Sequence, residues 1–162
     1  MLPRMVLVDP VSQLELDRLA VRNTLERYLV CLDRRDFPGL AACFTEDAEA
    51  NFEVAPERLI GAHAIVDFLR TIENYSASTH AWGNVSIVVQ GDGAESDLFV
   101  VATLLRGPAA TGRISVRGVR YQDRLVRSSG GWLIAERVHS ALWQYDVVAR
   151  APFSAEATRR DG

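Results

Sequence analysis

From Ala81 to Val148 the sequence has the pattern of consecutive β-strands, and this feature constrains the possible fold most. The expected strands cover 85–90, 95–106, 113–127 and 132–148. Short glycine-rich segments of the kind that form hairpin turns separate the first two and the last two of these strands. Since long strands curl, this half of the chain is expected to form a bent antiparallel sheet.

The first half of the sequence predicts three helices and one strand. A Ser-x-x-Glu capping box opens a helix over 12–33, and a proline at a permitted first-turn position starts a short helix that runs through Phe44. Apolar and polar residues then alternate over 48–54, as in a half-buried strand. Gly61 opens a third helix with one apolar stripe, and the loop 73–79 follows it.

This order of elements predicts an α+β fold in which three N-terminal helices close one face of a curved antiparallel sheet, as in a cone. The 162 residues suffice for one domain with both a core and a cavity. We expect an N-terminal tail over 1–11, the cone domain over 12–148 and a mobile C-terminal tail over 149–162.

Charge and hydropathy exclude several partners. The net charge is −3 and the 18 basic residues are scattered, so we expect no nucleic-acid partner. No apolar run approaches the ~18 residues that a membrane helix needs, and the N-terminus does not have the pattern of a signal peptide. These observations favour a cytoplasmic protein without a membrane partner. Cys31 and Cys43 fall in predicted helices and are expected to be buried free thiols without a chemical role.

Six short motifs follow one another in the order of a known family. They are Tyr28-x4-Asp33, Phe44-Thr45-Glu46-Asp47-Ala48, Gly61 before a helix, Thr79-His80, Gly118-x2-Tyr121 and Gly131-Trp132-x-Ile134-x2-Arg137. In this order they resemble the SnoaL-like family, in the superfamily of nuclear transport factor 2, scytalone dehydratase and ketosteroid isomerase. The resemblance covers 12–148 and implies a cone-shaped, cystatin-like α+β barrel; it says less about the reaction, because the fold hosts several activities.

Within that superfamily, the bile-acid 7α-dehydratase and hexachlorocyclohexane dehydrochlorinase are the most similar in pattern. Both have a polar residue five positions before an Asp at the end of the first helix, and a His just before the first long strand. Tyr28, Asp33 and His80 occupy these places. The ketosteroid isomerases match less well, because their catalytic Asp on the first strand corresponds to Phe52 here.

The resemblance implies that Tyr28, Asp33 and His80 are catalytic. An Asp that accepts from one imidazole nitrogen orients the ring, makes the other nitrogen more basic and stabilises the imidazolium. His80 is then the general base, and the Tyr28 phenol would protonate a leaving group or bind an oxyanion. The alternatives are that Asp33 is a solvent-exposed residue at the end of a helix, that His80 is a loop residue without a chemical role and that Tyr28 is a core residue.

Three further residues are expected to bind substrate. Phe52 and Trp82 would supply apolar walls, although such aromatic residues more often belong to the core. Arg137 on the final strand would meet an anionic group of the substrate, or else pair with a structural carboxylate. His63 is expected to be solvated, and His139, on the face of Arg137, is expected to be partly exposed rather than catalytic.

The sequence predicts neither a metal site nor a cofactor. The three histidines are far apart in the sequence, and no nucleotide-binding glycine motif is present. The expected function is a cofactor-independent dehydratase-type lyase acting on a small hydrophobic carbonyl or polyketide-like substrate. An isomerase or polyketide-type cyclase with the same base stays open, as does a non-catalytic binding or dimerisation module. A homodimer or higher homo-oligomer is the expected assembly.

Overall fold

The computed structural model describes residues 10–150. Three α-helices and a 3₁₀ helix lie in the first half of the chain: α1 (Pro10–Arg34), α2 (Phe37–Ala41), α3 (Ala62–Leu69) and η1 (Arg70–Asn74). The strands are β1 (Phe44–Phe52), β2 (Leu59–Ile60), β3 (Ala77–Gln90), β4 (Gly93–Arg106), β5 (Arg113–Ser128) and β6 (Gly131–Val148). The expected α+β class is confirmed.

The six strands form one curved, unclosed sheet in the order β2-β1-β6-β5-β4-β3. The long strands β3 to β6 pair antiparallel with their neighbours in sequence, as expected for hairpins. β1 pairs parallel with β6, with Ala50 opposite Arg137. The sheet is therefore mixed rather than wholly antiparallel. The parallel partners β1 and β6 are joined by a long connection through several other elements, since parallel strands cannot be joined by a tight turn.

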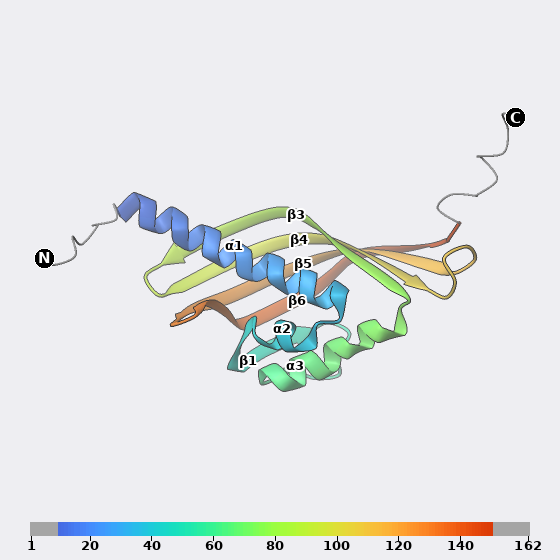
Figure 1. The fold of residues 1–162 in the computed structure, drawn as a ribbon, viewed down its shortest axis with the longest axis horizontal. Coiled ribbons are helices and arrows are strands. Elements are labelled where there is room, and N and C mark those ends of the chain that lie inside the picture. The colour runs from blue at the N-terminus through green and yellow to red at the C-terminus, as the bar shows by residue number, and fades with distance from the viewer. Residues whose placement is uncertain (1–9, 151–162) are drawn as a thin grey trace, which may run out of the picture.

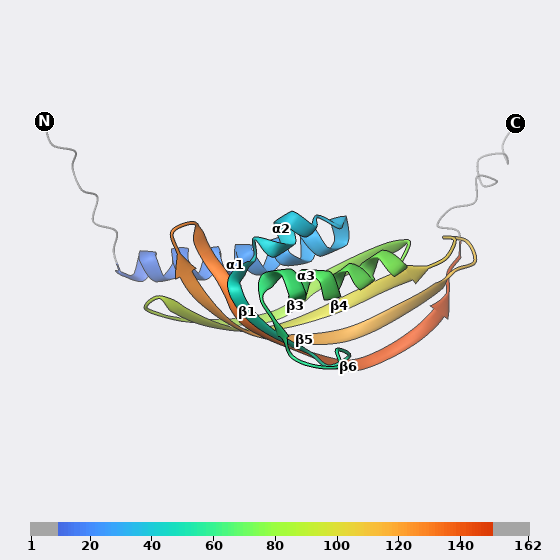
Figure 2. The ribbon, with the colours of Figure 1, turned by 90° about the horizontal axis from the view of Figure 1, so that it is seen from below.

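The helices lie on the concave side of the sheet. Figure 1 shows α1 crossing the long strands and α2 and α3 lying near β1, and Figure 2 shows the same helices inside the curve of the sheet. Alternate residues of β4, such as Leu98 and Val100, are buried beneath them. Together with Leu25, Leu40 and Ile65 of the helices, they belong to a single hydrophobic core.

Several predicted boundaries are wrong. The second helix ends at Ala41 and β1 already begins at Phe44, so Cys43 lies in a turn, although it is a buried free thiol as expected. The first helix begins at Pro10, which places the predicted capping residue Ser12 inside it. β3 begins at Ala77, within the expected loop, because backbone pairing with β4 extends the strand.

The end of the domain also differs from the prediction. Ala149, assigned to the C-terminal tail, is buried, and its backbone N–H donates to the Gly112 carbonyl at 2.8 Å. The rest of that predicted tail, 151–162, lies outside the described residues, as does 1–9 of the N-terminal one.

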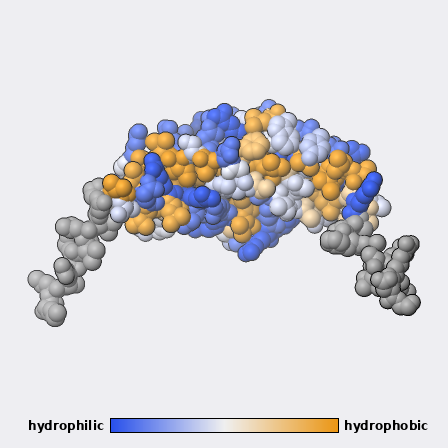
Figure 3. Space-filling model, turned by 90° about the horizontal axis from the view of Figure 1, so that it is seen from above, coloured by the Kyte–Doolittle hydropathy of each residue, from blue (hydrophilic) through white to orange (hydrophobic). Residues whose placement is uncertain are grey.

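The outer face of the sheet carries aromatic residues near the C-terminal end of β6. Trp143 lies over Gly118, where a Cβ atom would come within 2.2 Å of the indole, and it stacks on Tyr145. Figure 3 shows the arched outline of the molecule, with hydrophobic and hydrophilic residues mixed on the face in view. Within 10–150, no helix combines the length and hydrophobicity required to span a bilayer.

Candidate active site

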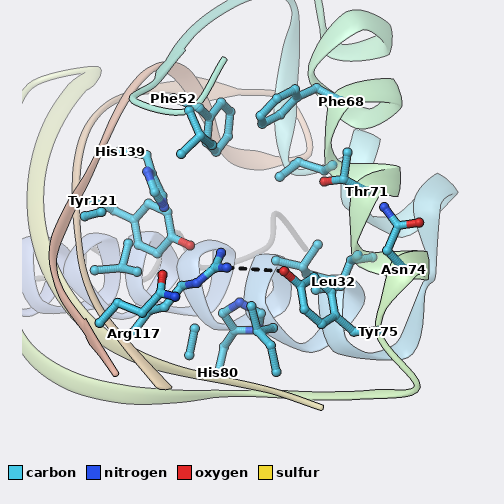
Figure 4. Close-up of a pocket in the computed structure, with 18 of the residues that line it drawn as sticks. Leu32, Phe52, Phe68, Thr71, Asn74, Tyr75, His80, Arg117, Tyr121 and His139 are labelled. Carbon is cyan, nitrogen blue, oxygen red and sulfur yellow. Dashed lines mark hydrogen bonds between the residues drawn. The ribbon is translucent and has the colours of Figure 1, made fainter. Parts of the chain in front are cut away.

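A cavity of about 440 Å³ lies between the concave face of the sheet and the helices. Its inner wall consists of buried residues, among them Tyr28, Phe52 and Tyr121. Exposed residues of η1 and β6, including Asn74 and Gln144, form its rim. Figure 4 shows polar side chains pointing into a space with aromatic walls.

Asp33 and His80 are in direct contact at this cavity, as the sequence predicted. His80 Nδ1 lies 2.7 Å from Asp33 Oδ1, and the backbone N–H of His80 donates to Asp33 Oδ2 at 2.8 Å. The Ser78 hydroxyl donates to Asp33 Oδ1 at 2.8 Å. The carboxylate therefore receives three hydrogen bonds from one strand, which fixes its position.

The local fold explains why these groups meet. Asp33 lies in the last turn of α1, which packs against β3. Ser78 and His80 are two positions apart on β3 and therefore point to the same face of the sheet, toward the helix. His80 lines the cavity, whereas Asp33 lies behind it.

The electrostatic environment defines the roles of the two side chains. Burial raises the pKa of Asp33, but the hydrogen bonds and charge of His80 and the bond from Ser78 outweigh burial, so that the pKa lies below its ordinary value. Asp33 is thus an ionised acceptor at neutral pH, and Nδ1 of His80 is the donor in their contact. In the tautomer that this contact selects, Nδ1 carries the proton and Nε2 is an acceptor, the arrangement that a general base requires.

Arg35 holds the end of α1 in place. Its backbone has a φ of 56°, in the left-handed region that often terminates a helix. Its guanidinium donates to the carbonyls of Asp33 and Tyr75 and to the Ser78 hydroxyl, with distances of 2.5, 3.1 and 3.0 Å. This side chain connects α1, η1 and β3 beside the Asp33–His80 contact. None of the sequence motifs includes Arg35.

Tyr28 lines the cavity, and its hydroxyl is buried without a hydrogen-bond partner among the described residues. Burial raises the pKa of the phenol, while the nearby Arg137 guanidinium partly counteracts this effect. The Tyr28 hydroxyl is therefore protonated at neutral pH and has a free donor.

Arg137 is placed differently from the expected substrate-binding residue. It is fully buried and does not line the cavity. Its guanidinium donates to both carboxylate oxygens of Asp123, at 2.6 and 2.8 Å, and lies 3.9 Å from the centre of the Tyr28 ring. The alternative reading, a structural ion pair, agrees with this geometry, because Asp123 already neutralises the charge.

The two expected aromatic walls also differ. Phe52 lines the cavity and packs against Phe68. Trp82 lies outside the cavity lining, on the face of β3 covered by α1, where its ring meets the Arg22 guanidinium at 5.2 Å. A register shift in the pairing of β3 with β4 follows Trp82. The prediction for Trp82 is therefore wrong.

No carboxylate of β1 takes the place of the isomerase base. Glu49 does not line the cavity and forms an ion pair with Arg58. Glu53, just after β1, is exposed and accepts from the Ala141 backbone N–H at 2.7 Å. Both observations agree with the expectation that a ketosteroid-isomerase arrangement is missing here.

Most lining residues were not expected from the sequence, and Arg117, Tyr121 and His139 are among them. His139 is a partly exposed residue of β6, as expected, but it also lines the cavity, where its ring packs against Phe52 and Tyr121. Burial lowers the pKa of His139, and the charge of Arg137 adds to this effect. Strand alternation from Tyr121 would have found Arg117, because residues four apart on a strand share a face.

The described residues contain no group of three or more His, Cys, Asp or Glu side chains placed to bind a metal ion. His63, as expected, is exposed at the start of α3. The lining of the cavity thus contains two imidazoles, one of them hydrogen-bonded to a carboxylate, together with three phenols and two guanidinium groups.

The sequence pattern of the SnoaL-like domain matches residues 14–138. The chain belongs to the SnoaL-like domain family. An uncharacterised protein of Mycobacterium tuberculosis is 28% identical to this SnoaL-like chain over 130 residues, which cover 79% of the chain and 87% of the relative.

Two solved structures have the same fold as this SnoaL-like chain. A provisionally assigned scytalone dehydratase from Novosphingobium aromaticivorans superposes with a TM-score of 0.72 at 21% identity, covering 87% of this chain and 96% of the other. Hexachlorocyclohexane dehydrochlorinase LinA-type3 from Novosphingobium barchaimii gives 0.69 at 19% identity, covering 86% and 99%. Both similarities are similarities of fold, and they agree with the α+β class described above.

Proposed function

We propose that this SnoaL-like protein is a cofactor-independent lyase of the dehydratase type. Its substrate is a small, largely apolar molecule that carries a hydroxyl group β to a carbonyl or similar activating group. His80 is the general base. The observation that carries the proposal is the hydrogen bond between Asp33 and a cavity-lining His80.

In this reaction Nε2 of His80 removes the proton from the carbon beside the carbonyl. The electron pair of the broken C–H bond forms the new C=C bond, and the bond to the β-hydroxyl breaks. Hydroxide leaves with a proton from the Tyr28 phenol, as water. Asp33 stabilises the imidazolium formed in the first step, and return of that proton to the Tyr28 phenolate restores the resting state.

The environment of each group supports its role. The lowered pKa of Asp33 keeps a negative charge beside the imidazole. The raised pKa of Tyr28 keeps the phenol protonated, so that it can donate its proton to the leaving group. Phe52, Leu104 and Val119 supply the apolar walls that a small carbon skeleton requires. The two structural neighbours are described as a dehydratase and a dehydrochlorinase, and both names denote elimination reactions.

An isomerase or cyclase would use the same base with another substrate, whereas a binding module would need no general base. The Asp33–His80 contact within a cavity favours an enzyme over a binding module. Products separate the enzymatic classes: elimination releases water and forms a double bond without a new ring, isomerisation keeps every atom, and cyclisation forms a ring.

The test is turnover of a panel of β-hydroxy-carbonyl and polyketide-like compounds, followed by ultraviolet absorbance of the conjugated product. His80→Ala should lower kcat by about 10²- to 10⁴-fold, the usual contribution of a general base. Asp33→Asn should reduce kcat less, and kcat more than KM, since it keeps the shape and removes the charge.

His63→Ala is the matched control, because His63 is an exposed histidine away from the cavity. It should leave turnover unchanged, and circular dichroism should show that all variants remain folded. Turnover of His80→Ala within a factor of a few of the wild-type value would remove His80 from the mechanism.

A further inference from the structure

The cavity carries positive charge that no carboxylate in its lining balances. Arg106 and Arg117 both line it, and none of the other lining residues is Asp or Glu. Arg106 lies at the exposed rim, whereas Arg117 reaches into the interior from the concave face of β5. Figure 4 shows the Arg117 side chain crossing the cavity toward Tyr75, with His80 on one side and Tyr121 on the other.

Arg117 is poorly satisfied by its surroundings. Its Nη2 donates to the Tyr75 hydroxyl at 3.2 Å, and its Nε is buried without a partner among the described residues. A guanidinium carries several N–H donors in one plane and matches a carboxylate with two parallel hydrogen bonds. A buried, unpaired donor on a charged group costs free energy that an anionic ligand would recover.

Acidic residues near Arg117 have other partners. Asp146 accepts from the Ser115 hydroxyl and lies 3.7 Å from Arg113, and Glu53 is bound to the backbone of β6. The Asp33 carboxylate is hydrogen-bonded to the backbone N–H and to Nδ1 of His80 on β3. Within 10–150 no carboxylate forms an ion pair with Arg117.

We propose that Arg117, with the Tyr75 hydroxyl beside it, is the binding site for a carboxylate group of the substrate. The ligand class is a hydrophobic monocarboxylate, with its apolar body against Phe52 and Val119 and its anionic end on Arg117. The carboxylate would belong to the substrate of the lyase proposed above. Carboxylate binding at Arg117 does not require that reaction, whereas the role of the bound molecule as a substrate rests on the proposed function.

Direct binding tests the inference without turnover. Isothermal titration calorimetry compares benzoate, 2-naphthoate and 4-phenylbutyrate with their primary amides, which have similar shapes and no charge. The wild-type protein should bind at least one carboxylate about tenfold to a hundredfold more tightly than its amide, the usual value of a hydrogen-bonded charge. Arg117→Met should abolish this preference, and Arg117→Lys should keep part of it.

Two control variants separate this proposal from the proposed reaction. Arg120→Met removes a guanidinium from the exposed face of the same strand, where it pairs with Asp97, and should leave the preference intact. His80→Ala should lose turnover but keep the preference for carboxylates. If the wild-type protein binds no carboxylate in the series more tightly than its amide, or if Arg117→Met keeps the preference, the carboxylate site is refuted whatever the turnover data show.

Discussion

The buried ion pair of Arg137 and Asp123 predicts a large effect of one small substitution. Both side chains have no solvent exposure, and two hydrogen bonds join them. Asp123→Asn changes the shape very little but leaves the Arg137 charge without a counterion. Removing one partner of a buried pair typically costs about 3–5 kcal/mol. For a domain of this size, that corresponds to a fall in Tm of about 6 to 20 °C.

Urea and thermal unfolding followed by circular dichroism measure this effect. Asp97→Asn is the matched control, since it breaks an exposed pair with Arg120 and should cost less than about 1 kcal/mol. Replacing both buried partners, in Asp123→Leu with Arg137→Met, should recover most of the lost stability because no charge remains buried. An Asp123→Asn protein within about 1 kcal/mol of the wild type would refute the structural role of the pair.

Two further predictions concern cavity residues with unusual surroundings. Tyr28→Phe removes a buried hydroxyl without a partner, so the free energy of unfolding should change by less than about 1 kcal/mol, whereas turnover should fall strongly; a large loss of stability in urea unfolding would contradict this. The pKa of His139 is lower in the folded protein than the unfolded value of about 6.5, so protonation favours the unfolded chain, and stability should decline as the pH falls through that value. Chemical unfolding at several pH values should show a weaker dependence in His139→Phe, and an unchanged dependence would refute the assignment.

Local patterns in the sequence predicted the hairpins and the helices, because strand turns and helical spacing depend on neighbouring residues. The parallel pairing of β1 with β6 was missed. It joins Phe44 to Ile134 and Phe52 to His139, far apart in the sequence, so no local pattern encodes it. The early start of β3 has the same cause, since β4 determines where pairing ends.

The candidate site was predictable where the family resemblance placed residues of two separate motifs together, as for Asp33 and His80. The prediction was wrong for Trp82 and incomplete for Arg137, whose carboxylate partner on β5 no motif identified. His139 and Arg117 were missed for a different reason. Alternation tells which residues share a face, but only the helices packed on that face determine which part is core and which part is cavity.

The hydrogen bonds of the Arg35 guanidinium join the end of α1, where Asp33 lies, to the mouth of the cavity. The guanidinium bonds to the Asp33 carbonyl in α1 and to the Tyr75 carbonyl next to η1, whose Thr71 and Asn74 lie at the rim. A displacement of η1 that widened the opening would therefore pull on the helix end that orients His80. Under the proposed mechanism, the width of the cavity mouth and the orientation of the base would therefore change together through Arg35, a residue that does not line the cavity.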